Sequence, residues 1–127
     1  MIQVLLVFLG GGLGSVVRHG VNVGIGRVFS GDFPLATLVI NVTGSFVMGL
    51  IIAWLAFRAT SPWSQHTRLL LTTGFLGGYT TFSTFSLDTA FLVERDAYGT
   101  AAMYVIGSVG LGILGLFAGL WLVRATG

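Results

Sequence analysis

The third apolar segment of the chain contains the run Gly74-Phe75-Leu76-Gly77-Gly78-Tyr79-Thr80-Thr81-Phe82-Ser83-Thr84-Phe85-Ser86, which sets three glycines and five small hydroxyl residues inside one hydrophobic stretch. A helix that runs through Gly77-Gly78 loses about 0.8 to 1 kcal/mol per glycine relative to alanine. The Thr80-Thr81 pair that follows is β-branched and forms helices weakly. We therefore predict an apolar helix that is broken near residues 77–81.

A break of this kind inside a membrane restricts what the segment can do. The freed carbonyl and N–H groups must be buried in protein, face water or hold an ion. One interpretation is a glycine kink whose backbone groups are satisfied by neighbouring hydroxyls. The other is a site that handles an ion, and the concentration of glycine and hydroxyl residues favours it.

The composition places the chain in a membrane. Of its 127 residues 54% are apolar and 8% charged, where an ordinary soluble domain carries about 25% charged residues. The mean hydropathy is +0.95. A net charge of +2 leaves no basic surface for phosphates, so nucleic-acid binding is excluded. With no cysteine and two isolated histidines, we expect no metal cage of side chains. The sequence shows no nucleophile with a neighbouring base, so we expect no enzyme.

Four segments have the length of a membrane crossing, which is about 20 mostly apolar residues for roughly 30 Å of hydrocarbon. The amino terminus lacks the positively charged region of a signal peptide, so we expect the first segment to remain as a helix. The predicted fold class is an all-α integral membrane protein, with one domain over residues 1–127 and a broken third helix. The four helices cover about residues 2–23, 35–57, 69–93 and 98–123.

The arginines give no clear orientation in the membrane. Four crossings put both termini and the middle loop on one side, and each side then carries three arginines. Because the bias of Lys and Arg between loops orients a small membrane protein, this tie predicts insertion in both directions. The natural assembly is then an antiparallel homodimer with its two-fold axis in the membrane plane. A weak bias that fixes one orientation is the alternative. The two sets are Arg58, Arg68 and Arg124 against Arg18, Arg27 and Arg95.

Polar residues recur on one face of two predicted helices. Thr37, Asn41 and Ser45 follow one another at intervals of four in the second, so they lie on the same side. Tyr104 and Ser108 have the same spacing in the fourth. An amide at membrane depth finds a partner either in a hydrogen bond between helices or as a polar position in a pore. The spacing alone leaves both interpretations open.

Acidic residues are scarce inside the predicted spans. Asp88 is the only one, whereas carriage of cations or coupling to protons usually needs an embedded carboxylate. Phe82 and Phe85 lie three residues apart, so they are neighbours on a helix. A phenyl ring is positive at its edge, and such an edge can face an anion without a fixed charge that would hold the anion too tightly. Two phenylalanines at this spacing are otherwise ordinary core residues.

The run 74–86 resembles the signature of the Fluc-type fluoride channels, small bacterial exporters also called CrcB. The segment 37–44, which contains Asn41, and the segment 12–18, which ends at Arg18, also resemble that family's patterns. The likeness extends over all four helices. It implies a dual-topology homodimer in the bacterial inner membrane, with two antiparallel pores at the subunit interfaces. These pores would export fluoride passively and lower its cytoplasmic concentration.

The resemblance also implies roles for particular residues. It places a structural Na⁺ at the dimer centre, held by the backbone carbonyls of Gly77 and Thr80 and by their symmetry copies. It places Arg18 in the aqueous vestibule. The positions that match the fluoride pore are Asn41, Phe82, Phe85, Tyr104, Ser108, Thr37 and Thr81.

Two positions depart from the family's pattern. Gly112 stands one turn past Ser108, where some members carry a second pore serine. The polar track is then either shorter here or completed by water. Asp88 stands where relatives have glutamate, so we expect no vestibule role that depends on the longer side chain.

Two other classes of protein share parts of this pattern. A proton-coupled small multidrug-type exporter also has four short helices, but it needs an embedded carboxylate in the first helix, and none is present. A non-transporting membrane scaffold would use the glycines and hydroxyls for packing alone, which gives the broken helix no purpose. We therefore predict a fluoride channel whose partners are fluoride, membrane lipid and a second copy of the chain.

Overall fold

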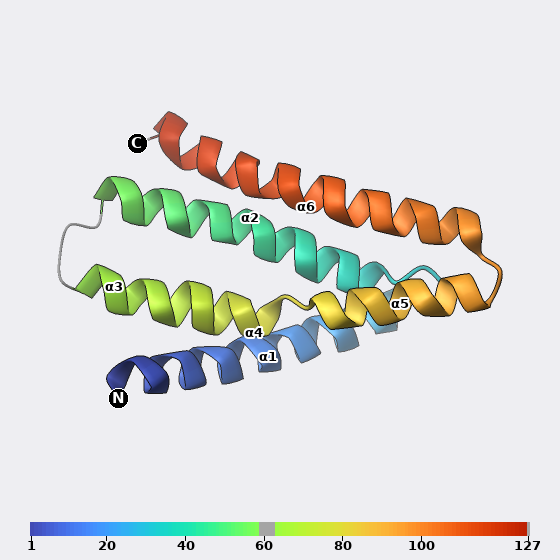
Figure 1. Cartoon of the computed structure of the whole chain (residues 1–127), viewed down its shortest axis with the longest axis horizontal. Coiled ribbons are helices and arrows are strands. Elements are labelled where there is room, and N and C mark those ends of the chain that lie inside the picture. Colours follow the sequence, from blue (N-terminus) through green and yellow to red (C-terminus); the bar gives the residue numbers. More distant parts are fainter. Residues whose placement is uncertain (59–62, 127) are drawn as a thin grey trace.

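The computed structural model describes residues 1–58 and 63–126, and every regular element in these ranges is helical. Figure 1 shows the helices lying along one long axis as a bundle. The elements are α1 (Ile2–Val28), α2 (Leu35–Arg58), α3 (Trp63–Arg68), the π-helical segment η1 (Leu69–Leu76), α4 (Gly77–Tyr79), α5 (Phe82–Glu94) and α6 (Tyr98–Thr126).

The chain passes along the bundle four times. In Figure 1, successive passes run in opposite directions: first α1, then α2, then the series from α3 to α5, and last α6. The start of α1 and the end of α6 therefore lie at the same end of the bundle. Within the described residues three helices, α1, α2 and α6, are long and apolar enough to cross a membrane. The other pass is divided among α3, η1, α4 and α5. The prediction of an all-α, multi-pass membrane protein is confirmed.

The helices extend farther than the expected crossings. α1 continues to Val28 rather than ending near residue 23, and α6 continues to Thr126 rather than to 123. α2 ends at Arg58, just beyond the expected 57. The expected limits came from the thickness of the hydrocarbon layer, whereas a helix can continue among the lipid headgroups. Arg27 and Arg124 in the last turns of α1 and α6 suit that polar region.

The third pass is helical from Trp63 to Tyr79, so it begins well before the expected residue 69. It is interrupted at Thr80 and Thr81, whose backbones are extended with ψ of 156° and 113°. The interruption falls within the range 77–81, but Gly77 and Gly78 stay helical, contrary to the expectation from glycine's low helix propensity. A Cβ at Gly78 would collide with a carbonyl oxygen of α1, so this glycine serves close packing.

Two pairs of elements pack most closely. α1 lies against η1 and α4, and α2 lies against α6. Small residues bring the backbones together in both pairs. A Cβ at Gly14 would collide with the carbonyl oxygen of Phe75, and a Cβ at Gly119 would collide with that of Phe46. The break in the third pass lies where the two pairs meet.

Large apolar side chains cover the outside of the bundle. Phe8, Ile106 and Trp121 are exposed by 74%, 72% and 67%, whereas Ile40 and Tyr104 are fully buried. Water solvates a continuous surface of this kind poorly. Lipid or a further protein chain therefore covers the outer face.

Candidate functional site

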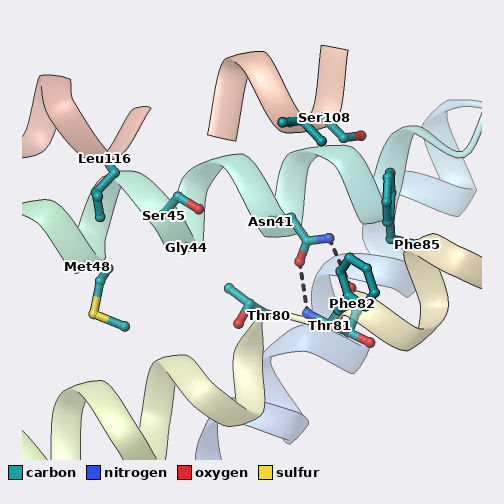
Figure 2. Close-up of a pocket in the computed structure, with 11 residues that line it drawn as sticks. Asn41, Gly44, Ser45, Met48, Thr80, Thr81, Phe82, Phe85, Ser108 and Leu116 are labelled. Atoms are coloured by element: carbon teal, nitrogen blue, oxygen red, sulfur yellow. Dashed lines mark hydrogen bonds between the residues drawn. The ribbon is translucent and has the colours of Figure 1, made fainter. Parts of the chain in front are cut away.

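The interruption of the third pass is held by the side chain of Asn41 on α2. Asn41 Nδ2 donates to the carbonyl oxygen of Thr81 at 3.0 Å, and the Thr81 N–H donates to Asn41 Oδ1 at 2.8 Å. Figure 2 shows both hydrogen bonds running from α2 to the extended segment. A single carboxamide thus satisfies both backbone groups of Thr81, which a broken helix inside a membrane requires.

The interruption also deprives the last carbonyl oxygens before it of their helical partners, including those of Gly77 and Thr80. In a continuous α-helix the Thr81 N–H would donate to Gly77 O, but here it donates to Asn41. The Thr84 N–H would likewise donate to Thr80 O, but it donates at 3.3 Å to Thr81 Oγ1, which caps α5. The oxygens of Gly77 and Thr80 are therefore freed at the break.

Neighbouring helices hold the break from both sides. On α1, Arg18 Nη1 donates to Thr80 O at 3.5 Å. On α2, the Thr43 hydroxyl lies 2.9 Å from the hydroxyl of Tyr79 on α4. A Cβ at Gly44, also on α2, would collide with the Thr80 methyl group. These contacts fix residues 79–81 in place, so the break is a defined feature of the fold.

A cavity of about 300 Å³ lies beside the break, formed by side chains of α2, α5 and α6 together with the break itself. Its described lining is mostly apolar, with amide and hydroxyl groups at intervals and no charged side chain. Ser45, Met48 and Val109 belong to this lining. It also contains predicted pore residues, which Figure 2 draws as sticks: Asn41, Thr81, Phe82, Phe85 and Ser108.

Ser108 supplies an unpaired hydroxyl to this cavity. Its Oγ is buried and has no hydrogen-bond partner, although a helical serine can donate to a carbonyl oxygen of the preceding turn. An unpaired buried polar group costs about 1–3 kcal/mol, so such an atom in a folded protein calls for an explanation. Since Ser108 lines the cavity, a ligand that accepts a hydrogen bond would satisfy it.

Two phenyl rings lie at the start of α5, next to the break. The ring centroids of Phe82 and Phe85 are 5.6 Å apart, with an angle of 46° between the planes. Phe85 packs against Tyr104, with a centroid distance of 5.2 Å. Phe82 has no such cover and is 78% exposed in the single chain. Its ring therefore lies where lipid or a second protein chain would meet the cavity.

Tyr104 packs against Phe85, and both Tyr104 and Thr37 lie outside the described lining of the cavity. Tyr104 is 0% exposed, and its hydroxyl donates to Asp88 Oδ2 at 3.1 Å. Thr37 is also buried. Phe33 packs edge-on against the phenol ring. The carboxylate of Asp88 is thus paired with a hydroxyl from α6.

The sequence around this site matches a known family. Residues 5–120 fit the family model described as CrcB-like protein, Camphor Resistance (CrcB). The chain belongs to the CrcB family. The match includes each predicted site residue, from Arg18 on α1 to Ser108 on α6.

Three named relatives are similar over nearly the whole chain. A protein of Rhodopseudomonas palustris (strain BisB5) is 62% identical over 121 residues, which are 95% of this chain and 96% of that protein. A protein of Nitrobacter hamburgensis is 62% identical over 122 residues, 94% of this chain and 95% of its own length. A protein of Methylobacterium nodulans is 51% identical over 127 residues and the full length of both chains. The first and third are named Fluoride-specific ion channel FluC, and the second Fluoride-specific ion channel FluC 2, so the names denote channels and not enzymes.

Several contacts of this CrcB chain were not predicted from the sequence. The Asn41–Thr81 pair joins residues 40 positions apart, and the Tyr104–Asp88 pair joins residues 16 positions apart. Helical spacing does not show pairs between separate segments of the chain. The cap of α5 could have been predicted, because threonine just before an apolar run is a favoured N-cap residue. That signal would have placed the interruption at Thr81 rather than at the glycines.

Proposed function

We propose that this CrcB family member is a fluoride-specific channel. It lets F⁻ leave the bacterial cytoplasm passively across the inner membrane and so lowers cytoplasmic fluoride. The names of its relatives support the choice of ion. The observation that carries the proposal is the unpaired, buried hydroxyl of Ser108 in an uncharged cavity. HF that enters by itself dissociates inside, so a selective anion pore needs neither ATP nor a coupled proton.

The proposed route offers hydrogen-bond donors without a fixed charge. Ser108 offers an O–H, and the Asn41 amide keeps one N–H after bonding to Thr81. Phe82 and Phe85 offer ring edges, which are positive. Such donors suit a small, strongly hydrated anion, and the absence of a fixed positive charge lets it leave again. The hydroxyl of Thr81 adds a polar group at the break.

The route continues on both sides of the cavity. Tyr104 and Thr37 form its polar wall beyond Phe85, and Arg18 draws anions toward the aqueous vestibule. At Gly112, where the family resemblance implies a second pore serine in some members, a Cβ would lie 3.8 Å from Ser45 Oγ. Ser45 also lines the cavity. We therefore assign to Ser45 the place of the missing hydroxyl in the polar track.

A second copy of the chain completes the site in this proposal. The exposed ring of Phe82 beside a cavity in the single chain supports a protein cover, and the even division of arginines supports an inverted partner. The two-fold axis of an antiparallel homodimer repeats this site once more across the same interface, which gives two antiparallel pores. Membrane lipid covers the remaining apolar surface.

The residues at the break fit a structural Na⁺. Among the described residues no cluster of His, Cys, Asp and Glu is suited to a metal ion, but the freed oxygens of Gly77 and Thr80 are hard ligands of the kind alkali cations take. Thr80 O keeps a second lone pair beside the one that Arg18 uses. Bound there, Na⁺ would supply a positive charge at the dimer centre for the carbonyl oxygens of both breaks.

Fluoride efflux tests this function. Liposomes that contain the purified protein should release trapped fluoride to a fluoride electrode once an ionophore lets K⁺ follow. Ser108→Ala should slow release about tenfold, because a hydrogen bond to a charged group contributes about 1.5–3 kcal/mol and 1.4 kcal/mol is a factor of ten. Thr126→Val is the matched control on α6, since Thr126 Oγ1 already donates to Leu122 O.

Two results would count against the proposal. Wild-type vesicles that retain their fluoride would contradict the function itself. Equal rates for Ser108→Ala and the wild type would leave the function standing but remove the role of this hydroxyl.

A further inference from the structure

Asn41 lies between the proposed cation site at the break and the proposed anion path along the cavity. Its side chain forms both hydrogen bonds to Thr81, it lines the cavity, and it takes the N–H that would otherwise have bonded to Gly77 O. We infer that Asn41 is a positioning residue that builds the cation site and the anion path together. This inference rests on the proposed function, and it explains how one side chain creates both the cation site and the anion path.

The orientation of the Asn41 carboxamide is fixed by Thr81. A backbone N–H must face an acceptor and a backbone carbonyl must face a donor. A flipped amide would set Nδ2 against the Thr81 N–H and Oδ1 against the Thr81 carbonyl oxygen. The side chain therefore has one stable orientation, with Oδ1 and one Nδ2 hydrogen committed to Thr81.

This orientation determines which group remains for an anion. Nδ2 carries two hydrogens, and Thr81 O takes one of them. In Figure 2, Nδ2 lies toward Phe82 and Phe85, whereas Oδ1 lies toward Thr80. The free amide hydrogen is thus on the side of the phenyl rings, so the backbone of the break sets a donor there rather than an acceptor.

The same pair of bonds creates a cation ligand. Without an acceptor at Asn41, the Thr81 N–H would turn back to Gly77 O and extend α4, as in an ordinary helix. The Thr80 oxygen does not depend on Asn41, since Thr84 N–H is held by Thr81 Oγ1. Loss of the Asn41 amide should therefore remove one of the two carbonyl ligands that each chain provides and weaken sodium binding without abolishing it.

Two substitutions at Asn41 separate these effects. Asn41→Leu removes the acceptor and the donors together. Asn41→Asp keeps an oxygen for the Thr81 N–H, and its neutral carboxyl group donates its single O–H to the Thr81 carbonyl oxygen, which leaves no second hydrogen for an anion. The aspartate variant should therefore keep the cation site and lose the anion path, which a merely structural asparagine would not do.

The experiment measures two quantities on each purified protein. One is binding of ²²Na⁺, and the other is fluoride efflux from liposomes. We expect Asn41→Leu to bind sodium about tenfold more weakly and to pass fluoride about tenfold more slowly, the size expected for a lost ligand or charge-assisted hydrogen bond. Asn41→Asp should bind sodium within about threefold of the wild type but show the same loss of efflux. Phe82→Ile, the matched control, should bind sodium like the wild type.

The results test the cation site, the anion path and the proposed function separately. Undiminished sodium binding by Asn41→Leu would overturn the cation half of the inference, and so would a wild type that passes fluoride but binds no sodium. Wild-type efflux by Asn41→Asp would overturn the anion half. A wild type that passes no fluoride would instead overturn the proposed function.

Discussion

Phe82→Ile should slow fluoride efflux from liposomes by about tenfold or more, which corresponds to about 1.4 kcal/mol on the barrier. Isoleucine keeps the apolar character of the side chain but removes the positive ring edge. Phe82 is 78% exposed in the single chain, so the change costs little packing within it. Phe85→Ile should slow efflux as well, with an added loss of stability because Phe85 packs on Tyr104.

Phe117→Ile provides the matched control. Phe117 is 59% exposed on α6 and does not belong to the described lining of the cavity. Its replacement should leave the efflux rate, the elution volume and the melting temperature of the purified protein close to those of the wild type. If both Phe82→Ile and Phe85→Ile passed fluoride at the wild-type rate, ring edges would have no part in conduction.

Single cysteines at opposite ends of the bundle should be labelled from both sides of the membrane in intact cells. The chain has no cysteine of its own, so Gly31→Cys before α2 and Thr126→Cys at the end of α6 give clean sites. Because the arginines divide evenly between the two ends, about half of the molecules should insert each way. A membrane-impermeant maleimide, applied before or after permeabilisation, measures the two fractions.

The comparison of the two sites contains its own control. With insertion in both directions, each site reacts in part before permeabilisation and in full afterwards. With one fixed orientation, one site reacts fully from outside and the other only after permeabilisation. That second pattern would defeat dual insertion and, with it, the antiparallel dimer.

Hydrophobicity predicts the four passes because the thickness of the bilayer sets a minimum length of apolar chain. It does not predict where a helix stops outside the hydrocarbon, and α1 accordingly runs on to Val28. The low helix propensity of glycine, for its part, misplaces the cause of the break. Gly78 is needed for contact with α1, whereas the interruption follows from Thr81 acting as the cap of α5 and from Asn41 taking its N–H.

The candidate site was only partly accessible from the sequence. Helical spacing brings Phe82 next to Phe85 and singles out Asn41 and Ser108 as polar positions, and the likeness to the CrcB family adds a pore role for all four. The structure places them around the same cavity. The missing hydrogen-bond partner of Ser108 could not be predicted, since it depends on the three-dimensional arrangement of neighbouring helices. The hydrogen bond between Tyr104 and Asp88 also depends on how the helices are arranged in three dimensions.

Selectivity for fluoride over chloride is the most direct test of an uncharged, donor-lined anion path. A planar bilayer that contains the purified wild-type protein is bathed by KF on one side and by KCl at equal concentration on the other, and the reversal potential is recorded. Each tenfold preference for one anion shifts this potential by about 59 mV. The predicted result is a reversal potential displaced from zero by more than about 100 mV, in the direction that a preference for fluoride over chloride gives. A reversal potential near zero would contradict it.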